Sequence, residues 1–140
     1  MATIFFDLGD TLVRAGFQGQ PPRLRFTPLE FAAALIARLG AAGHRLGIIS
    51  NTGDLAAAEV DAALADIGLL DAFDPGLRIY SGDFPDLQPK PAPDLFEEAM
   101  RRAGAGERLF FVGENPAERA TAGALGFETA APGALDALPD

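Results

Sequence analysis

Three apolar segments of this chain each end abruptly in small or charged polar residues. The junctions are Ile4-Phe5-Phe6 before Asp7, Leu46-Gly47-Ile48-Ile49 before Ser50-Asn51, and Leu109-Phe110-Phe111-Val112 before Gly113-Glu114. Short apolar runs that stop at a turn are typical of strands buried within a parallel sheet. Because open α/β sheets carry their chemistry at the carboxyl ends of the strands, we expect these polar residues to line one shared site.

Segments with helical periodicity separate the strand-like runs, which is the pattern of βαβ units. We therefore predict an α/β fold of the three-layer Rossmann-like type, in which helices flank a mostly parallel five-stranded sheet. Residues 14–26 are polar and contain glycines and prolines, so they are predicted to form a loop. The elements expected after this loop are a helix that starts with a capping box at Thr27-Pro28-Leu29-Glu30, a strand at 45–49, a helix capped by Asp54, a strand at 77–80, a helix after Pro93, a strand at 108–112, a helix from about Pro116 and a strand at 127–130.

Length and composition limit the organisation and the partners of the chain. Its 140 residues predict a single domain over 1–140, with 131–140 as a loose tail in which Leu135 and Leu138 could dock as one turn. The formal net charge of −9 argues against nucleic acid or an anionic membrane as a partner. Cysteine is absent, which rules out disulfides and thiolate metal sites. No apolar run reaches the length of about 18 residues that a membrane span needs, so we expect a soluble, cytoplasmic protein.

Four motifs, taken in chain order, resemble those of the haloacid dehalogenase-like superfamily of aspartate-nucleophile hydrolases. They are Asp7-Leu8-Gly9-Asp10-Thr11-Leu12, then Ser50-Asn51, then Lys90 within Gln88-Pro89-Lys90-Pro91, and finally Gly113-Glu114-Asn115-Pro116-Ala117-Glu118. The resemblance implies a phosphatase that uses Mg²⁺ and forms an aspartyl-phosphate intermediate on a phosphorylated substrate. The substrate itself is not indicated by the sequence.

The resemblance also implies roles for the residues that would act on the phosphoryl group. Asp7 would be the nucleophile that attacks phosphorus and forms an acyl-phosphate, which water later cleaves. Ser50 would donate its hydroxyl to a phosphoryl oxygen, and Asn51 would hold either the substrate or the loop. Lys90 would neutralise the phosphoryl group and steady the nucleophile.

The expected metal ligands are oxygen atoms, which magnesium prefers. They are the Asp7 carboxylate, the Gly9 carbonyl and the Glu114 carboxylate, with Glu118 either as a further ligand or as a partner of Lys90. The family usually has aspartate where this chain has Glu114 and Glu118, and an acid–base aspartate where it has Gly9. Asp10 is a candidate substitute for that acid–base group, although a turn-forming role suits it better. Slow turnover is therefore expected.

The spacing of the motifs leaves no room for a cap domain over the site. Thirty-eight residues separate Thr11 from Ser50, and another 38 separate Asn51 from Lys90, which suffices only for core elements. We therefore expect a site open to solvent unless residues 14–26 or a second copy of the chain covers it. That openness makes a homo-oligomer worth testing.

Two other functions compete with the phosphatase. The absence of a carboxylate at position 9 and the two glutamates of the fourth motif favour a catalytically weak or inactive module that binds phosphate for regulation. A dehalogenase acting on small haloacids fits less well, because that chemistry usually goes with a cap that encloses an apolar substrate.

Overall fold

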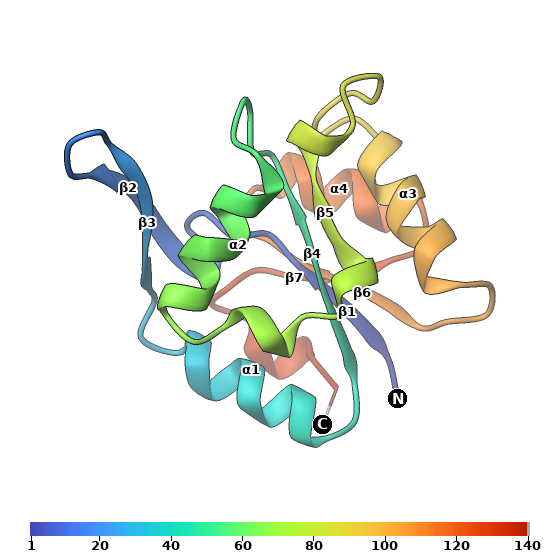
Figure 1. The fold of residues 1–140 in the computed structure, drawn as a ribbon. Coiled ribbons are helices and arrows are strands. Elements are labelled where there is room, and N and C mark those ends of the chain that lie inside the picture. Colours follow the sequence, from blue (N-terminus) through green and yellow to red (C-terminus); the bar gives the residue numbers. More distant parts are fainter. Residues whose placement is uncertain (140) are drawn as a thin grey trace.

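The computed structural model describes residues 1–139 and is built on a parallel sheet with the strand order β5-β4-β1-β6-β7 (Figure 1). The strands are β1 (Thr3–Phe6), β4 (Arg45–Ser50), β5 (Arg78–Tyr80), β6 (Leu109–Val112) and β7 (Glu128–Ala130). All four residues of β1 are buried, as a strand in the middle of a parallel sheet must be. Phe6, the last residue of β1, pairs with Ile48 of β4 and Val112 of β6. The residues that follow these strands therefore meet at one edge of the sheet.

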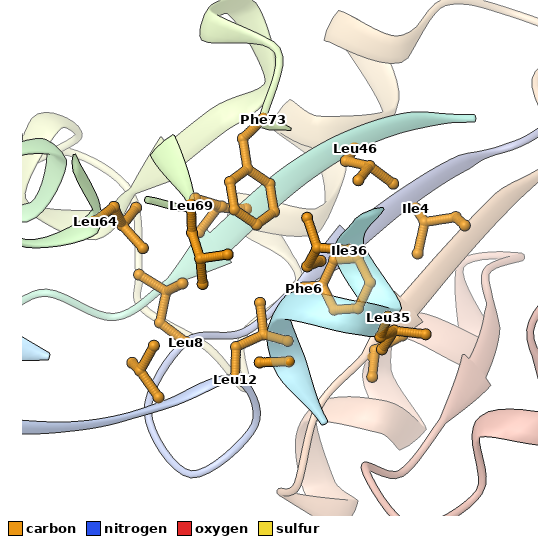
Figure 2. Close-up of a cluster of buried hydrophobic side chains, with 14 of the residues drawn as sticks. Ile4, Phe6, Leu8, Leu12, Leu35, Ile36, Leu46, Leu64, Leu69 and Phe73 are labelled. Carbon is orange, nitrogen blue, oxygen red and sulfur yellow. The ribbon is translucent and has the colours of Figure 1, made fainter. Parts of the chain in front are cut away.

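Helices cover both faces of the sheet, which confirms the three-layer prediction. The helices are α1 (Ala32–Ala41) and α2 (Ala57–Asp66) on one face, and α3 (Asp94–Ala103) and α4 (Pro116–Ala124) on the other. Successive side chains of a strand point to opposite faces, so Phe6 joins the core under α1 and α2 and Phe5 joins the core under α3 and α4. Figure 2 shows Phe6 close to Leu35 and Ile36 of α1. Residues 1–139 contain no cap domain.

The prediction of a loop over residues 14–26 is wrong, because this segment is an antiparallel β-hairpin. It consists of β2 (Val13–Gln18) and β3 (Arg23–Pro28), paired from Val13 opposite Pro28 to Gln18 opposite Arg23. Apolar and polar residues alternate in both strands, and this period of two outweighs the glycines and prolines as a structural signal. Gly19 adopts a φ of 93° in the connecting turn, where a residue without a Cβ is favoured.

The hairpin is attached to the body at one end and projects from it at the other (Figure 1). Leu24 is buried in the main core, and Phe26 packs against that core. Arg25 forms an ion pair with Asp66 at the end of α2. Phe17, near the turn, is 60% exposed. The hairpin is therefore anchored through β3 and through the buried Val13 at the start of β2, whereas its turn faces solvent.

Two predicted helix starts lie in the wrong place. Thr27 and Pro28 belong to β3 because their backbones pair with β2, and α1 begins only at Ala32, with no side chain capping it. Asp54 does not cap α2, which begins at Ala57; instead, the Glu59 carboxylate accepts a hydrogen bond of 3.2 Å from the Ala56 amide. Pairing between strands thus overrides the local capping signal at Thr27.

The C-terminal segment contacts the body of the protein. Leu135–Ala137 forms a single 3-10 turn, and the side chain of Leu138 is buried in the core under α1 and α2. Further 3-10 turns lie at Leu70–Ala72, Pro75–Leu77 and Ser81–Asp83. In the described part of the chain, none of the helices has the length and apolar character needed to cross a membrane.

Candidate active site

A buried lysine joins two carboxylates at the carboxyl edge of the sheet. The Lys90 ammonium nitrogen lies 3.0 Å from Asp7 Oδ1 and 2.7 Å from Glu118 Oε1, and the lysine side chain is only 1% exposed. Both contacts are ion pairs that lack the geometry of a hydrogen bond. The ammonium also lies 5.1 Å from the centre of the Phe111 ring, within cation–π range. A charge this deeply buried is tolerable only with opposite charges beside it.

The fold brings the three members of this cluster together from distant parts of the sequence. Asp7 follows the central strand β1, and its amide donates a 2.9 Å hydrogen bond to the Val112 carbonyl of β6. Glu118 lies in the first turn of α4, where Asn115 caps the helix by accepting from the amides of Ala117 (2.8 Å) and Glu118 (3.2 Å). The cap and the strand pairing thus fix both carboxylates on either side of Lys90.

Asn51 holds the backbone of Lys90 through both ends of its side-chain amide. Its Nδ2 donates to the Lys90 carbonyl (2.9 Å), and its Oδ1 accepts from the Lys90 amide (3.0 Å). Of the two roles expected for Asn51, this geometry gives it the role of fixing the loop. A direct contact with substrate stays a prediction.

Replacing Asn51 with alanine should lower the free energy of unfolding by about 1–3 kcal/mol, because two partly buried polar groups of Lys90 lose their partners. Urea unfolding followed by circular dichroism measures the loss. Gln88→Ala, in the same loop, is the matched control: Gln88 is exposed, its side chain makes no hydrogen bond to the described residues, and the expected change is within about 0.5 kcal/mol. Equal losses in both variants would contradict the role given to Asn51.

Ser50 ends β4 beside this loop and is buried opposite Tyr80 of β5. Its hydroxyl makes no hydrogen bond within residues 1–139 and is therefore available to a ligand. Tyr80 is not available in that way, because its hydroxyl donates a 2.6 Å hydrogen bond to Asp61 of α2. Burial and this bond to Asp61 raise the pKa of the Tyr80 phenol well above its usual range.

Three further hydroxyl-bearing residues organise the site and were missed in the sequence. Thr11 is fully buried, and its hydroxyl accepts a 3.0 Å hydrogen bond from the Glu114 amide, which ties the first motif to the fourth. The Ser81 hydroxyl accepts from the Thr52 amide (2.7 Å), and the Thr52 hydroxyl accepts from the Gly82 amide (3.0 Å). Small hydroxyl residues in the turns that follow the strands were the available signal for these contacts.

The two glutamates of the fourth motif have different surroundings. Glu118 is buried against Lys90, whereas Glu114 is exposed and its carboxylate has no partner among residues 1–139. Glu114 follows β6 and Asp7 follows β1, which are neighbouring strands. The structure thus favours the second of the two roles expected for Glu118, as a partner of Lys90.

The oxygen atoms near Asp7 fit magnesium in their chemistry. Magnesium binds one or two carboxylates together with phosphate oxygens and water, and the Asp7 and Glu114 carboxylates with the Gly9 carbonyl supply such a set. No group of three or more acidic or histidine side chains that could hold a metal by itself occurs in the described part of the chain. A metal held here would therefore depend on oxygen atoms from a phosphorylated ligand and from water.

Position 9 has space for a side chain that it does not carry. Gly9 is exposed, and a Cβ built on it would meet no atom within 4 Å, apart from its neighbours in the chain. Its backbone is not left-handed, so a larger residue is tolerable there. Asp10 is the residue that adopts the left-handed conformation, with a φ of 61°, and its amide donates to the Val13 carbonyl (2.8 Å). Asp10 is thus part of the turn that leads into β2.

Comparison with known proteins assigns the family. The family model of the haloacid dehalogenase-like hydrolases matches residues 24–126. The chain therefore belongs to the haloacid dehalogenase-like hydrolases, as the motifs predicted. A search of curated proteins gave no match.

Among solved structures, similar ones include both phosphatases and dehalogenases. The D,D-heptose 1,7-bisphosphate phosphatase from B. bronchiseptica, complexed with magnesium and phosphate, is 17% identical with a TM-score of 0.70, and the match covers 92% of this chain and 79% of the phosphatase. The L-2-haloacid dehalogenase from Xanthobacter autotrophicus is 29% identical with a TM-score of 0.61, covering 76% of this chain but only 40% of the dehalogenase. A phosphatase from Thermococcus onnurineus is 25% identical with a TM-score of 0.60, covering 74% of this chain and 46% of the phosphatase.

Proposed function

We propose that this hydrolase is a magnesium-dependent phosphatase that works through an aspartyl-phosphate on Asp7. The observation that carries the proposal is the buried Lys90 ammonium 3.0 Å from the Asp7 carboxylate, at the carboxyl edge of the central strand. A fixed cation at that point orients the carboxylate and offers positive charge where phosphoryl oxygens would bind. The buried Glu118 holds the same cation from the other side.

The proposed reaction has two displacements at phosphorus. First, an Asp7 oxygen forms a bond to phosphorus, and the bond between phosphorus and the leaving oxygen breaks with its electron pair on that oxygen. Water then attacks phosphorus, which releases phosphate and restores the Asp7 carboxylate. Throughout, Lys90 and the free Ser50 hydroxyl offer positive charge and a hydrogen bond to the phosphoryl oxygens. Magnesium, held by Asp7, the Gly9 carbonyl and Glu114, would neutralise part of the charge on the phosphate.

The open surroundings of the site support a phosphorylated substrate that a cap does not enclose. Gly9 and Asp10 are both exposed, and the hairpin that follows them projects from the body (Figure 1). A homo-oligomer in which a second copy covers this edge stays a prediction, which size-exclusion chromatography with light scattering tests.

The first experiment measures magnesium-dependent hydrolysis of p-nitrophenyl phosphate and acetyl phosphate by the wild type and by Asp7→Asn. We expect measurable turnover in the wild type and background rates in Asp7→Asn, because an amide is a poor nucleophile toward phosphorus. Asp71→Asn is the matched control, since Asp71 is an exposed aspartate in the 3-10 turn Leu70–Ala72 and should keep the wild-type rate. Equal rates in the wild type and in Asp7→Asn would overturn the proposal.

A second candidate function is a phosphate-binding module without catalysis. The lack of a carboxylate at position 9 and the engagement of Glu118 with Lys90 favour it. Thermal unfolding with vanadate separates the two functions: stabilisation that requires magnesium supports the phosphatase, and stabilisation by phosphate without magnesium supports the binding module.

The 29% identity to the Xanthobacter dehalogenase makes haloacid hydrolysis a third candidate. The match covers only 40% of that enzyme, and residues 1–139 hold no domain that encloses a small apolar substrate. Chloride release from 2-chloropropionate, absent in Asp7→Asn, would establish dehalogenation in place of the phosphatase.

A further inference from the structure

Among residues 1–139, the site holds a nucleophile and a cation but no acidic side chain fixed in place to protonate the leaving group. Lys90 is buried, and its ammonium is paired with the carboxylates of Asp7 and Glu118. The Tyr80 phenol is buried and bonded to Asp61. His44, the only histidine, accepts a hydrogen bond from the Ala2 amide (2.9 Å), which precedes β1 and so lies at the opposite edge of the sheet.

The family usually has an acid–base aspartate two residues after the nucleophile, and in this chain that position is Gly9. It carries no side chain, and the space in which one would stand is empty of protein atoms. The next residue, Asp10, has its backbone committed to the turn into β2, and its exposed carboxylate makes no contact that holds it toward Asp7 in the described residues. An incoming substrate therefore meets Asp7 and Lys90, and none of the described side chains is fixed in place to protonate the leaving oxygen.

We infer that this site takes acyl phosphates, in which phosphate is joined to a carboxyl group, in preference to alkyl phosphate esters. The inference rests on the proposed phosphatase function and narrows its substrate class. It follows from the leaving group, because a carboxylate departs as a stable anion, whereas an alkoxide must gain a proton as it leaves.

When the substrate is an acyl phosphate, the first displacement needs no acid. An Asp7 oxygen bonds to phosphorus, the bond from phosphorus to the acyl oxygen breaks, and the electron pair stays on the released carboxylate. In the second displacement water attacks phosphorus, and its proton passes to bulk water, which reaches the exposed Gly9. No side chain is fixed in place to act as a base for that water, so the second step is slow and the aspartyl-phosphate accumulates.

Two variants of equal size at position 9 test the inference, because aspartic acid can donate a proton to the leaving group and asparagine cannot. Gly9→Asp should raise the ratio of kcat/KM for ethyl phosphate to kcat/KM for acetyl phosphate by about 10²-fold or more, the usual contribution of a placed acid. Gly9→Asn, an amide of the same shape, should not raise that ratio. Both variants should fold, because a side chain at this position meets no neighbouring atom.

Rapid-mixing kinetics of the wild type give an independent test, which is the size of the initial burst of acetate. Acetyl phosphate should give a burst of acetate close to one equivalent per chain before a slow steady rate, and Gly9→Asp should shrink that burst by speeding the second step. A burst that is lost in Asp7→Asn and reduced in Gly9→Asp supports the inference.

The inference and the proposed function fail in different ways. If the wild type cleaves ethyl phosphate as fast as acetyl phosphate, and Asp7→Asn abolishes both reactions, the inference is overturned while the phosphatase stands. A gain in Gly9→Asn equal to that in Gly9→Asp, or a loss in Asp10→Asn confined to ethyl phosphate, would also overturn it. If the wild type cleaves p-nitrophenyl phosphate but not acetyl phosphate, the inference is likewise overturned while the phosphatase stands. If Asp7→Asn cleaves acetyl phosphate as fast as the wild type, or the wild type cleaves none of these phosphates, the proposed function falls and the inference falls with it.

Discussion

Replacing Lys90 with methionine should lower the free energy of unfolding by about 3–5 kcal/mol, the usual result of removing one partner from a buried ion pair. Methionine fills much of the same space, so the loss comes mainly from charge. Asp7 and Glu118 would be left buried on either side of an apolar side chain, with no cation to balance them. Urea unfolding measures the loss, and phosphatase activity should fall to background in the same variant.

A triple variant separates charge from packing in this cluster. Combining Lys90→Met with Asp7→Asn and Glu118→Gln removes all three charges while it keeps the shapes of the side chains. We expect the triple variant to recover most of the stability that Lys90→Met loses, because neutral buried groups of similar volume often match an ion pair. If the triple variant stays as unstable as Lys90→Met alone, packing at Lys90 rather than charge is the main effect of the substitution.

The second large effect is expected at Phe6, next to the nucleophile in the central strand. Phe6→Ala should lower the free energy of unfolding by about 3–5 kcal/mol, because it removes a fully buried ring and leaves a cavity. The ring packs edge-to-face on Phe73 with 6.3 Å between centroids and lies under α1 (Figure 2). The shift of the urea midpoint at constant m-value gives the loss.

Phe17→Ala is the matched control for Phe6→Ala. Phe17 is the same residue type in a strand, but it is 60% exposed near the tip of the hairpin, so the expected change is within about 0.5 kcal/mol. A loss of several kcal/mol in Phe17→Ala would show that its ring is covered in solution, and light scattering would then tell whether a second copy covers it.

The sequence was sufficient to predict the sheet and its site edge. Apolar runs that end in polar residues mark strands buried on both faces, and β1, β4 and β6 lie side by side as that pattern requires. The expectation that Lys90 lies near Asp7 agrees with the 3.0 Å contact, although their catalytic roles stay predictions. The motif residues thus indicated where the candidate site lies, because each follows a strand or lies in a short loop beside one.

The hairpin and the partner of Glu118 were not predicted. The alternation of apolar and polar residues in β2 and β3 was a sequence signal for the hairpin, and the glycines and prolines of the segment obscured it. The contacts of Leu24 and Arg25 that attach the hairpin to the body lie between distant parts of the chain. Whether Glu118 binds a metal or a lysine depends on where α4 places its first turn relative to the loop of Lys90, a distance that periodicity and spacing do not give.

The central position of β1 also affects how the protein is made. The strand comes near the beginning of the chain, yet its two neighbours are β4 and β6, and β6 begins only at Leu109. During synthesis one edge of this apolar strand stays unpaired until nearly the whole domain has left the ribosome, and such edges promote aggregation. A fragment that stops before Leu109 would therefore expose the strand that leads to Asp7, and a second fragment carrying β6 and β7 should be able to complete it.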